Sequence, residues 1–110
     1  MRKNMGYDDY RVVTTQRAQA DLDGIADYIS GELNAPAAAR NIVLAIHKAI
    51  STLSFSPQGL PRVRDDGLAA QGYRWVGIKN YMAFYTIDEQ NKVVNVERIL
   101  YGRRDWKHIL

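Results

Sequence analysis

The side chains of this sequence that could carry chemistry are cations and aromatic rings in its last third. Guanidinium and ammonium groups neutralise phosphate or carboxylate, and aromatic rings stack on bases or fill pockets of a partner protein. The set comprises Arg74, Lys79, Tyr81, Arg98, Tyr101, Arg103, Arg104, Trp106 and His108. Gathered at one end of a small sheet, these side chains would form a surface that meets something anionic or something large.

One reaction open to this set is the cleavage of RNA. Arg74 with Arg98 or Arg104 could hold phosphate and stabilise the charge of a pentavalent transition state. Proton transfer would then fall to Tyr101 or His108, which carry the hydroxyl and imidazole that such chemistry uses. Packing is the simpler explanation for each of these rings, because aromatic side chains dominate cores and interfaces.

Other familiar chemistries are excluded by their missing motifs. The sequence has no cysteine, no Gly-rich phosphate loop and no nucleophile elbow, so we expect no cofactor and no thiolate metal site. Asp21, Asp23 and Asp27 are spaced i, i+2 and i+6, which does not bring them together on a helix, and we expect a solvated face. His47 has no second histidine at ligand spacing, and we expect a boundary residue rather than a metal ligand.

The charge of the chain is unevenly distributed along it. Lys and Arg outnumber Asp and Glu by 15 to 12, for a net charge of +3. Residues 1–71 balance at eight against eight, whereas residues 72–110 hold seven basic and four acidic side chains. This asymmetry is compatible with a nucleic-acid or acidic-protein partner, and a solvated sheet edge is the alternative. No apolar run could cross a membrane and no secretory signal is evident, so we expect a cytoplasmic protein.

The elements that must position these residues follow from periodicity. Residues 1–9 are predicted to be a flexible N-terminus, and residues 10–110 a single domain. A β-branched run, Tyr10–Thr14, predicts a strand, and Thr14 or Thr15 could cap the helix that follows. The first helix is predicted over Gln16–Leu33 and the second over Ala37–Leu53, as an antiparallel hairpin. The apolar stripes consist of Leu22, Ile25, Ala26, Ile29 and Leu33, and of Ile42, Ile46, Ala49, Ile50 and Leu53.

Three further strands are predicted after an irregular stretch, Ser54–Gln71. They cover about residues 73–78, 81–87 and 92–100, joined by tight turns at Lys79-Asn80 and at residues 88–91. In the last strand, strict alternation places Val94, Val96 and Arg98 on one face and Ile99 on the other. A short helical turn is predicted after Gly102. The order β-α-α-β-β-β predicts an α+β fold, with a helical hairpin on a mainly antiparallel four-stranded sheet.

This order and three segments resemble the RelE/ParE superfamily of bacterial type II toxins over about residues 10–110. The segments are DLDGIADYI, GYRWVGIKNYMAFYTID and VERILYGRRDWKHIL. The final segment, in which Arg98 leads through Tyr101 into Arg103, Arg104 and Asp105, is nearer to the ParE branch. The resemblance implies a toxin that a cognate antitoxin, encoded beside it, neutralises within a hetero-oligomeric complex. The antitoxin's C-terminal segment would fold onto a groove of the toxin as helix or strand.

The branch of the superfamily implies the target. ParE-like members are associated with poisoning DNA gyrase, and this reading makes Lys79, Tyr81, Arg98, Arg103, Arg104 and Trp106 the target-binding residues. RelE-like members cut messenger RNA on the ribosome without a metal and commonly carry Arg directly after the Tyr of the middle strand. This sequence has Met82 there, and a thioether cannot pair with phosphate, so the gyrase hypothesis is favoured. A ribosome-dependent endoribonuclease is the alternative, and a non-toxic member that only binds its antitoxin is a third possibility.

Overall fold

The computed structural model describes residues 9–59 and 70–102. A π-helical turn, Tyr28–Glu32, extends the first helix, and 3₁₀ turns at Thr52–Ser54 and Pro57–Gly59 follow the second. The remaining elements are β1 (Arg11–Thr14), α1 (Gln16–Asp27), α2 (Pro36–Ser51), β2 (Arg74–Ile78), β3 (Tyr81–Asp88) and β4 (Val93–Tyr101). The predicted order β-α-α-β-β-β is confirmed.

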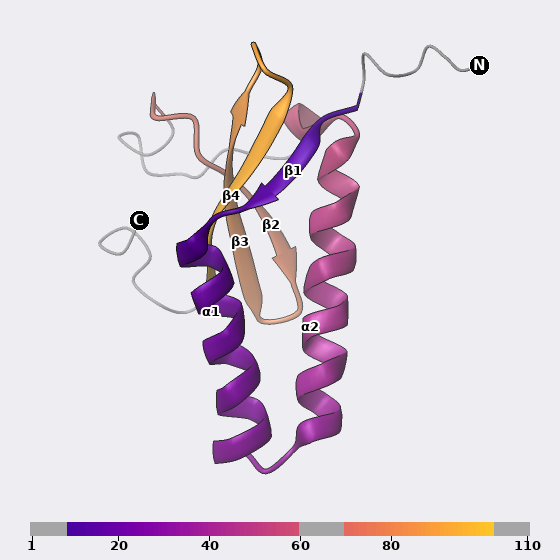
Figure 1. Ribbon diagram of the computed structural model, residues 1–110, viewed down its shortest axis with the longest axis vertical. Helices are drawn as coiled ribbons and strands as arrows, with labels where there is room; N and C mark the ends of the chain where they lie inside the picture. Colours follow the sequence, from indigo (N-terminus) through magenta and orange to yellow (C-terminus); the bar gives the residue numbers. More distant parts are fainter. Residues whose placement is uncertain (1–8, 60–69, 103–110) are drawn as a thin grey trace, which may run out of the picture.

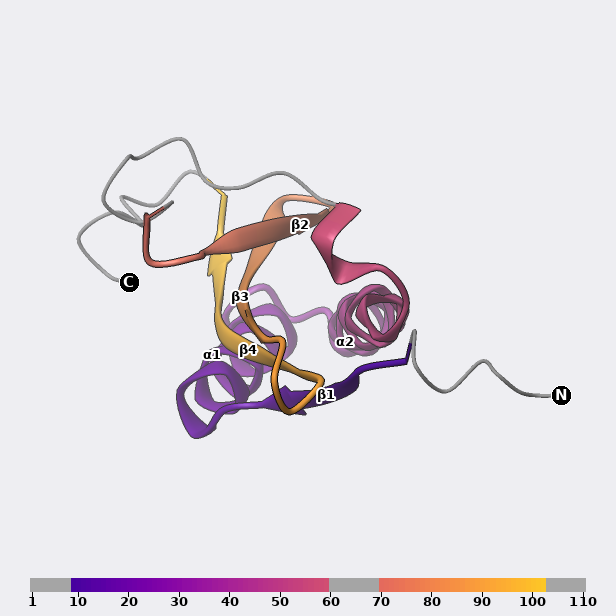
Figure 2. The ribbon, with the colours of Figure 1, turned by 90° about the horizontal axis from the view of Figure 1, so that it is seen from above.

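The four strands form one sheet in the order β1-β4-β3-β2. The pairs β2–β3 and β3–β4 are antiparallel, while β1 lies parallel to β4 at the edge of the sheet. The helical hairpin packs on this mixed sheet, and its tip extends past the turn that joins β2 to β3 (Figure 1). Seen from above, β1 and β2 form the two edges of the sheet, and α1 lies near the β1 edge (Figure 2). The predicted α+β class is therefore confirmed.

Thr15 fixes the entry from β1 into α1. Its hydroxyl accepts a hydrogen bond from the Ala18 amide at 3.1 Å, which confirms the predicted helix cap. The same hydroxyl lies 3.2 Å from the Glu97 carbonyl, to which it donates. Because one side chain serves both the helix start and β4, the first turn of α1 is held against the sheet.

The first helix ends differently from the prediction. Regular α-helix stops at Asp27, and the π-helical turn then adds one residue to the helical repeat. The stripe therefore loses its phase: Ile29 is buried, but Leu33 is 55% exposed. The prediction that Leu33 faces the core is wrong for this reason. Within the described part of the chain, no helix combines the length and the apolar character needed to span a membrane.

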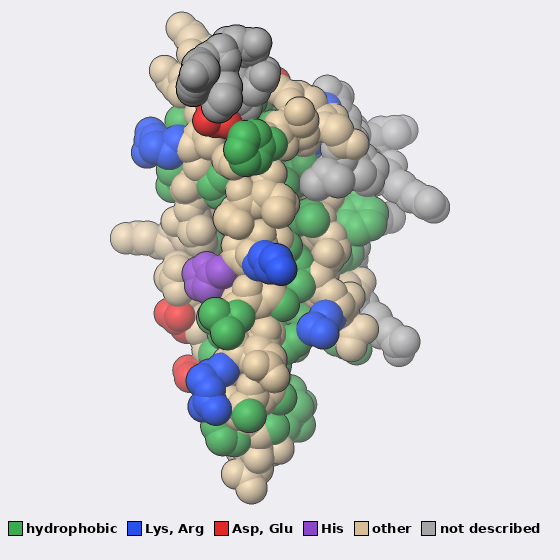
Figure 3. Space-filling model, turned by 90° about the vertical axis from the view of Figure 1, so that its right-hand side faces the viewer, with side chains coloured by type: hydrophobic (Ala, Val, Ile, Leu, Met, Phe, Trp, Pro, Cys, Tyr) green, Lys and Arg blue, Asp and Glu red, His purple; other side chains and the backbone are tan. Residues whose placement is uncertain are grey.

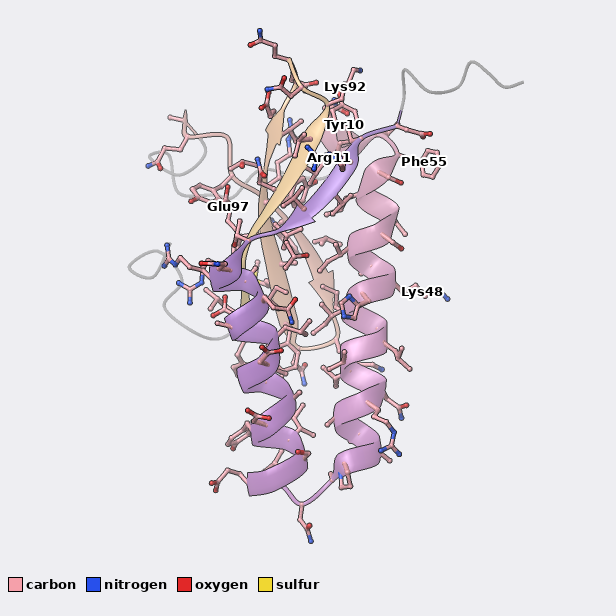
Figure 4. The ribbon with its side chains drawn as sticks, viewed as in Figure 1. Tyr10, Arg11, Lys48, Phe55, Lys92 and Glu97 are labelled. Atoms are coloured by element: carbon pink, nitrogen blue, oxygen red, sulfur yellow. The ribbon has the colours of Figure 1, made fainter. Side chains whose placement is uncertain are left out.

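The second helix confirms its predicted stripe. Pro36 occupies the first turn of α2, where its missing amide hydrogen costs no hydrogen bond. Ile46, Ile50 and Leu53 are buried in the core, and Ile42 and Ala49 pack against it. The opposite face carries exposed residues such as Leu44 and Lys48, and the Lys48 side chain points away from the body of the molecule (Figure 4).

A β-bulge corrects the predicted faces of β4. Tyr85 pairs with Val96 and Phe84 pairs with Arg98, so Glu97 has no partner in β3. One inserted residue shifts the alternation of every residue after it. Ile99 consequently joins Val94 and Val96 in the same core cluster, although strict alternation predicts opposite faces.

Asp21 joins α1 to β4 through three hydrogen bonds. Its carboxylate accepts from Nε and Nη2 of Arg98 at 2.7 and 2.8 Å, and from the Ile99 amide at 2.9 Å. Both side chains of the ion pair are only 14% exposed. The paired carboxylate raises the pKa of Arg98 further, against the opposing effect of burial. The prediction of a fully solvated face for the three aspartates is therefore wrong at Asp21.

The geometry predicts that Asp21 contributes far more to stability than its neighbour Asp23. Asp21→Ala would remove the carboxylate that accepts from a mostly buried guanidinium and from the Ile99 amide, so we expect a loss of about 2–4 kcal/mol in the free energy of unfolding. Asp23 is exposed and accepts only from Gln19, and Asp23→Ala should change stability by less than about 0.5 kcal/mol. Urea denaturation followed by circular dichroism measures both. Equal losses in the two variants would contradict the role given to Asp21.

Candidate functional site

Tyr81 and Tyr101 form an aromatic pair where β3 begins and β4 ends. They are direct partners in the antiparallel register, and their rings meet edge to face at 5.8 Å between centroids. The turn Lys79-Asn80 joins β2 to β3 beside them, and the Gly102 amide donates to the Asn80 carbonyl at 2.8 Å. We call this region the turn end of the sheet. It brings together three of the predicted site residues: Lys79, Tyr81 and Tyr101.

A small cavity of about 240 Å³ opens at the turn end. Trp75 and Met82 line it together with Lys79 and the tyrosine pair. Lys79 is exposed and has a left-handed backbone, with φ of 54°, as the tight turn requires. The cavity therefore combines aromatic and thioether walls with one cation at its rim.

Arg74 lies at the opposite end of the sheet. Arg74 is the first residue of β2 and pairs with Tyr85. Ile78, four residues later, is the last residue of β2 and lies at the turn end. Its guanidinium donates to the Gln58 carbonyl at 3.0 Å. The structure therefore separates Arg74 from Lys79 and Tyr81, and it holds Arg74 against the 3₁₀ turn after α2.

The remaining predicted residues are either held internally or lie outside the described residues. Arg98 is bound to Asp21 as described above, so its guanidinium supports α1. Arg103, Arg104, Trp106 and His108 lie beyond Gly102, outside the part of the chain that the structure describes. The predicted loop residues Leu60, Val63 and Leu68 also fall outside it.

The environment of Tyr81 keeps its hydroxyl protonated. Burial raises its pKa above the ordinary value of 10.0, and the nearby Tyr101 and Tyr28 raise it further. A phenol acts as a general base only as the phenolate, which these neighbours disfavour at neutral pH. Tyr81 is therefore suited to donate a hydrogen bond and to offer its ring as a contact surface.

A larger groove lies on the helix side of the turn end. It measures about 820 Å³ and runs between α1 and the end of β4. Its lining includes three large apolar side chains that are well exposed, Tyr28 at 54%, Leu33 at 55% and Tyr101 at 39%. Surface apolar side chains gathered at one groove mark a site where another molecule binds.

The floor of this groove is an open strand edge. β1 pairs with β4 only as far as Val96, so no described strand lies beside Glu97–Tyr101 on that side. The Gly102 amide bonds to Asn80, so the backbone groups of Ile99 and Tyr101 point away from β3. The Asp21 carboxylate accepts a hydrogen bond from the Ile99 amide, whereas the backbone of Tyr101 faces outward. Such an edge can pair with an extended segment of another chain.

Tyr28 and Leu33 are site residues that sequence reasoning missed. Helical spacing assigned Leu33 to the core, and Tyr28 stood outside the predicted set. Gly31 and Asn34 interrupt helix propensity in this stretch, and this irregularity was the available sign that the helical repeat changes. The π-helical turn then presents both apolar side chains at the groove.

The comparison with family models decides the family. The model of the ParE toxin of the type II toxin-antitoxin system parDE matches residues 12–106. The chain belongs to the ParE toxin family. The predicted membership of the RelE/ParE superfamily, nearer the ParE branch, is thereby confirmed.

Solved structures share the fold of this ParE-family toxin. A chain of the chromosomal ParDE system from P. aeruginosa has a TM-score of 0.70 and 24% identity, covering 84% of this chain and 95% of that one. A chain of the toxin-antitoxin complex RelBE2 from Mycobacterium tuberculosis has a TM-score of 0.58 and 20% identity. That match covers 84% of this chain and 98% of the other. No curated protein matches the sequence of this chain.

A polar cluster explains how the Arg74 end of the toxin is held. The Tyr10 hydroxyl donates to Glu89 Oε1 at 2.5 Å, and Gln58 Nε2 donates to both Glu89 oxygens. Lys92 lies over the Tyr10 ring, with 4.8 Å from Nζ to the centroid, and the two residues are neighbours in Figure 4. These contacts join the residue before β1, the turn after β3 and the 3₁₀ turn at Pro57–Gly59.

The cluster predicts a pH dependence of stability that centres on Glu89. Hydrogen bonds from Tyr10 and then Gln58 lower the pKa of Glu89, so its stabilising effect is present above the unfolded pKa of about 4.3. That effect is lost as the pH falls through the lower, folded pKa. Glu89→Gln should therefore flatten the acid limb of a plot of unfolding free energy against pH. Glu32→Gln, at the exposed hairpin tip, is the control and should leave the limb unchanged; identical curves for wild type and Glu89→Gln would contradict the assignment.

Proposed function

We propose that this ParE-family toxin arrests growth by binding DNA gyrase, and that a cognate antitoxin neutralises it. The observation that carries the proposal is the character of the turn end. Its described side chains are rings, a thioether, one amide and one exposed cation, which suits recognition of a protein surface. Gyrase is the target that membership of the ParE branch implies.

The contacts of the cations argue against a phosphate-cleaving site among the described residues. Arg98 gives two of its donors to Asp21, and Arg74 lies at the other end of the sheet. Met82 lines the cavity at the position where nuclease members of the superfamily carry Arg. The raised pKa of Tyr81 opposes its use as a base. Binding therefore explains the turn end better than catalysis does.

We assign the gyrase contact to Lys79 and Tyr81, extended by Arg103, Arg104 and Trp106 from the C-terminal segment. Lys79 and the Tyr81–Tyr101 pair form a continuous described surface. Arg98 acts in this proposal as a positioning residue, because its pair with Asp21 sets α1 against the end of β4.

A supercoiling assay with purified gyrase tests the proposal. Wild-type toxin should inhibit supercoiling, and Lys79→Gln should raise the half-inhibitory concentration about threefold to tenfold, as expected for the loss of an exposed charge contact. Lys48→Gln is the matched control, because Lys48 is an exposed lysine that points away from α2 (Figure 4).

Three outcomes would overturn the gyrase assignment. Supercoiling that is unaffected at saturating toxin removes the target. Discrete, codon-register cuts in translated messages after induction would assign the ribosome-dependent nuclease instead. Unharmed growth after induction would indicate a non-toxic, antitoxin-binding member.

We propose that the antitoxin segment binds in the groove between α1 and the open edge of β4. A bound segment would shield the exposed apolar side chains there from water, and the outward-facing backbone of Tyr101 could pair with it as a strand. An extended segment with apolar residues at alternate positions would place one set of side chains against Tyr28 and Leu33.

Calorimetric titration with the antitoxin encoded by the neighbouring reading frame tests this site. Leu33→Asp should weaken binding at least about tenfold, because it places a charge in an apolar contact. Phe55→Asp is the matched control, since Phe55 is also exposed, at 64%, but lies at the far end of α2, away from the groove (Figure 4). Equal affinities for Leu33→Asp and wild type would move the antitoxin to another surface.

A further inference from the structure

A second cavity lies between the two helices, on the side of α1 away from the antitoxin groove. It measures about 450 Å³, and small or apolar side chains, Ala26, Ala39 and Val43, line it. Ala26 stands two residues after Gly24 of the first groove, which is about 200° around an α-helix. The two grooves therefore lie on different sides of α1.

This cavity lies in the half of the hairpin nearest its tip, and the tip extends past the sheet (Figure 1). Leu44 lies at its rim and is 66% exposed, the most exposed large apolar side chain among the described residues. Figure 3 shows hydrophobic side chains beside Lys and Arg along the face that α2 presents. An exposed leucine beside a groove of small residues combines a knob with the hole that could receive it.

The charges at the rim are complementary to a second copy of the same surface. Asp27 stands on the α1 wall and Arg40 on the α2 wall, both exposed, and neither is ion-paired within the described residues. Asp27 lies seven residues before Asn34 and Arg40 six residues after it, so both stand at a similar distance from the tip. A two-fold axis parallel to the groove places α1 of each copy over α2 of the other copy. Asp27 of each copy then lies beside Arg40 of the other, which gives two symmetric pairs.

We propose that this toxin self-associates through the outer face of its helical hairpin, as a two-fold dimer. Leu44 of each copy enters the cavity of the other, and the two symmetric pairs of Asp27 and Arg40 fix the register. The interface leaves the turn end and the open edge of β4 uncovered. The dimer is thus independent of the proposed gyrase and antitoxin contacts.

Sedimentation equilibrium of toxin made by cell-free synthesis tests the dimer. Wild type should dimerise with a Kd in the micromolar range, and Leu44→Asp should be monomeric. Asp27→Arg and Arg40→Asp should each raise the Kd about tenfold or more, because each places two like-charged pairs in the interface. The double variant Asp27→Arg/Arg40→Asp regenerates both pairs and should return the Kd to within about threefold of wild type.

Lys48→Glu is the charge-changing control, since Lys48 is exposed on α2 but does not line the cavity. All substituted side chains are exposed, so thermal melts should match wild type and separate lost association from lost folding. A wild type that is monomeric at high micromolar concentration overturns the proposal, as does a double variant no tighter than either single variant. If the wild type is monomeric and the Leu44→Asp variant no longer binds the antitoxin, the cavity belongs to the antitoxin instead.

Discussion

The carboxylate of Asp21 substitutes for a missing strand. β1 ends at Thr14, where the chain turns into α1, and β4 continues through Tyr101 with no described strand beside it. Asp21 supplies the acceptor that a neighbouring strand would give to the Ile99 amide, and it neutralises Arg98 at the same point. Because both partners are largely shielded from water, this contact fixes how α1 crosses the end of the sheet.

The position of α1 in turn creates the main groove. The second turn of α1 is held against the edge of β4 by Asp21, and the groove lies between α1 and the last residues of that strand. The π-helical turn follows α1 and places Tyr28 and Leu33 in the lining of this groove. The burial of Tyr85, whose hydroxyl donates to the Pro57 carbonyl at 2.7 Å and whose pKa is raised to about 12, anchors the far end of the sheet. One end of the molecule is thus tied internally and the other is open.

Local sequence patterns predicted the elements well, because each depends on residues near in sequence. Alternation and helical spacing located both helices and all four strands, and Thr15 marked the helix start. Two insertions of a single residue defeated the same patterns, the bulge at Glu97 and the π-helical turn before Leu33. The bulge depends on pairing with β3, which periodicity within β4 does not contain, and the π-helical turn was marked locally only by Gly31 and Asn34. The predicted use of Arg98 as a contact residue likewise took no account of Asp21, 77 positions away.

The described cations of the last third do not form one positive patch. Of the four described cations in the last third, Arg98 is neutralised by Asp21, Arg74 donates to Gln58, and Lys92 covers the Tyr10 ring. Lys79 is the member of this group that stands exposed at the turn end. A surface with one such cation among aromatic side chains has too little positive field to attract a nucleic acid by counterion release, but it suffices to orient a protein contact. Because the described cations of this third do not gather on one surface, the turn end favours recognition of a protein over recognition of RNA.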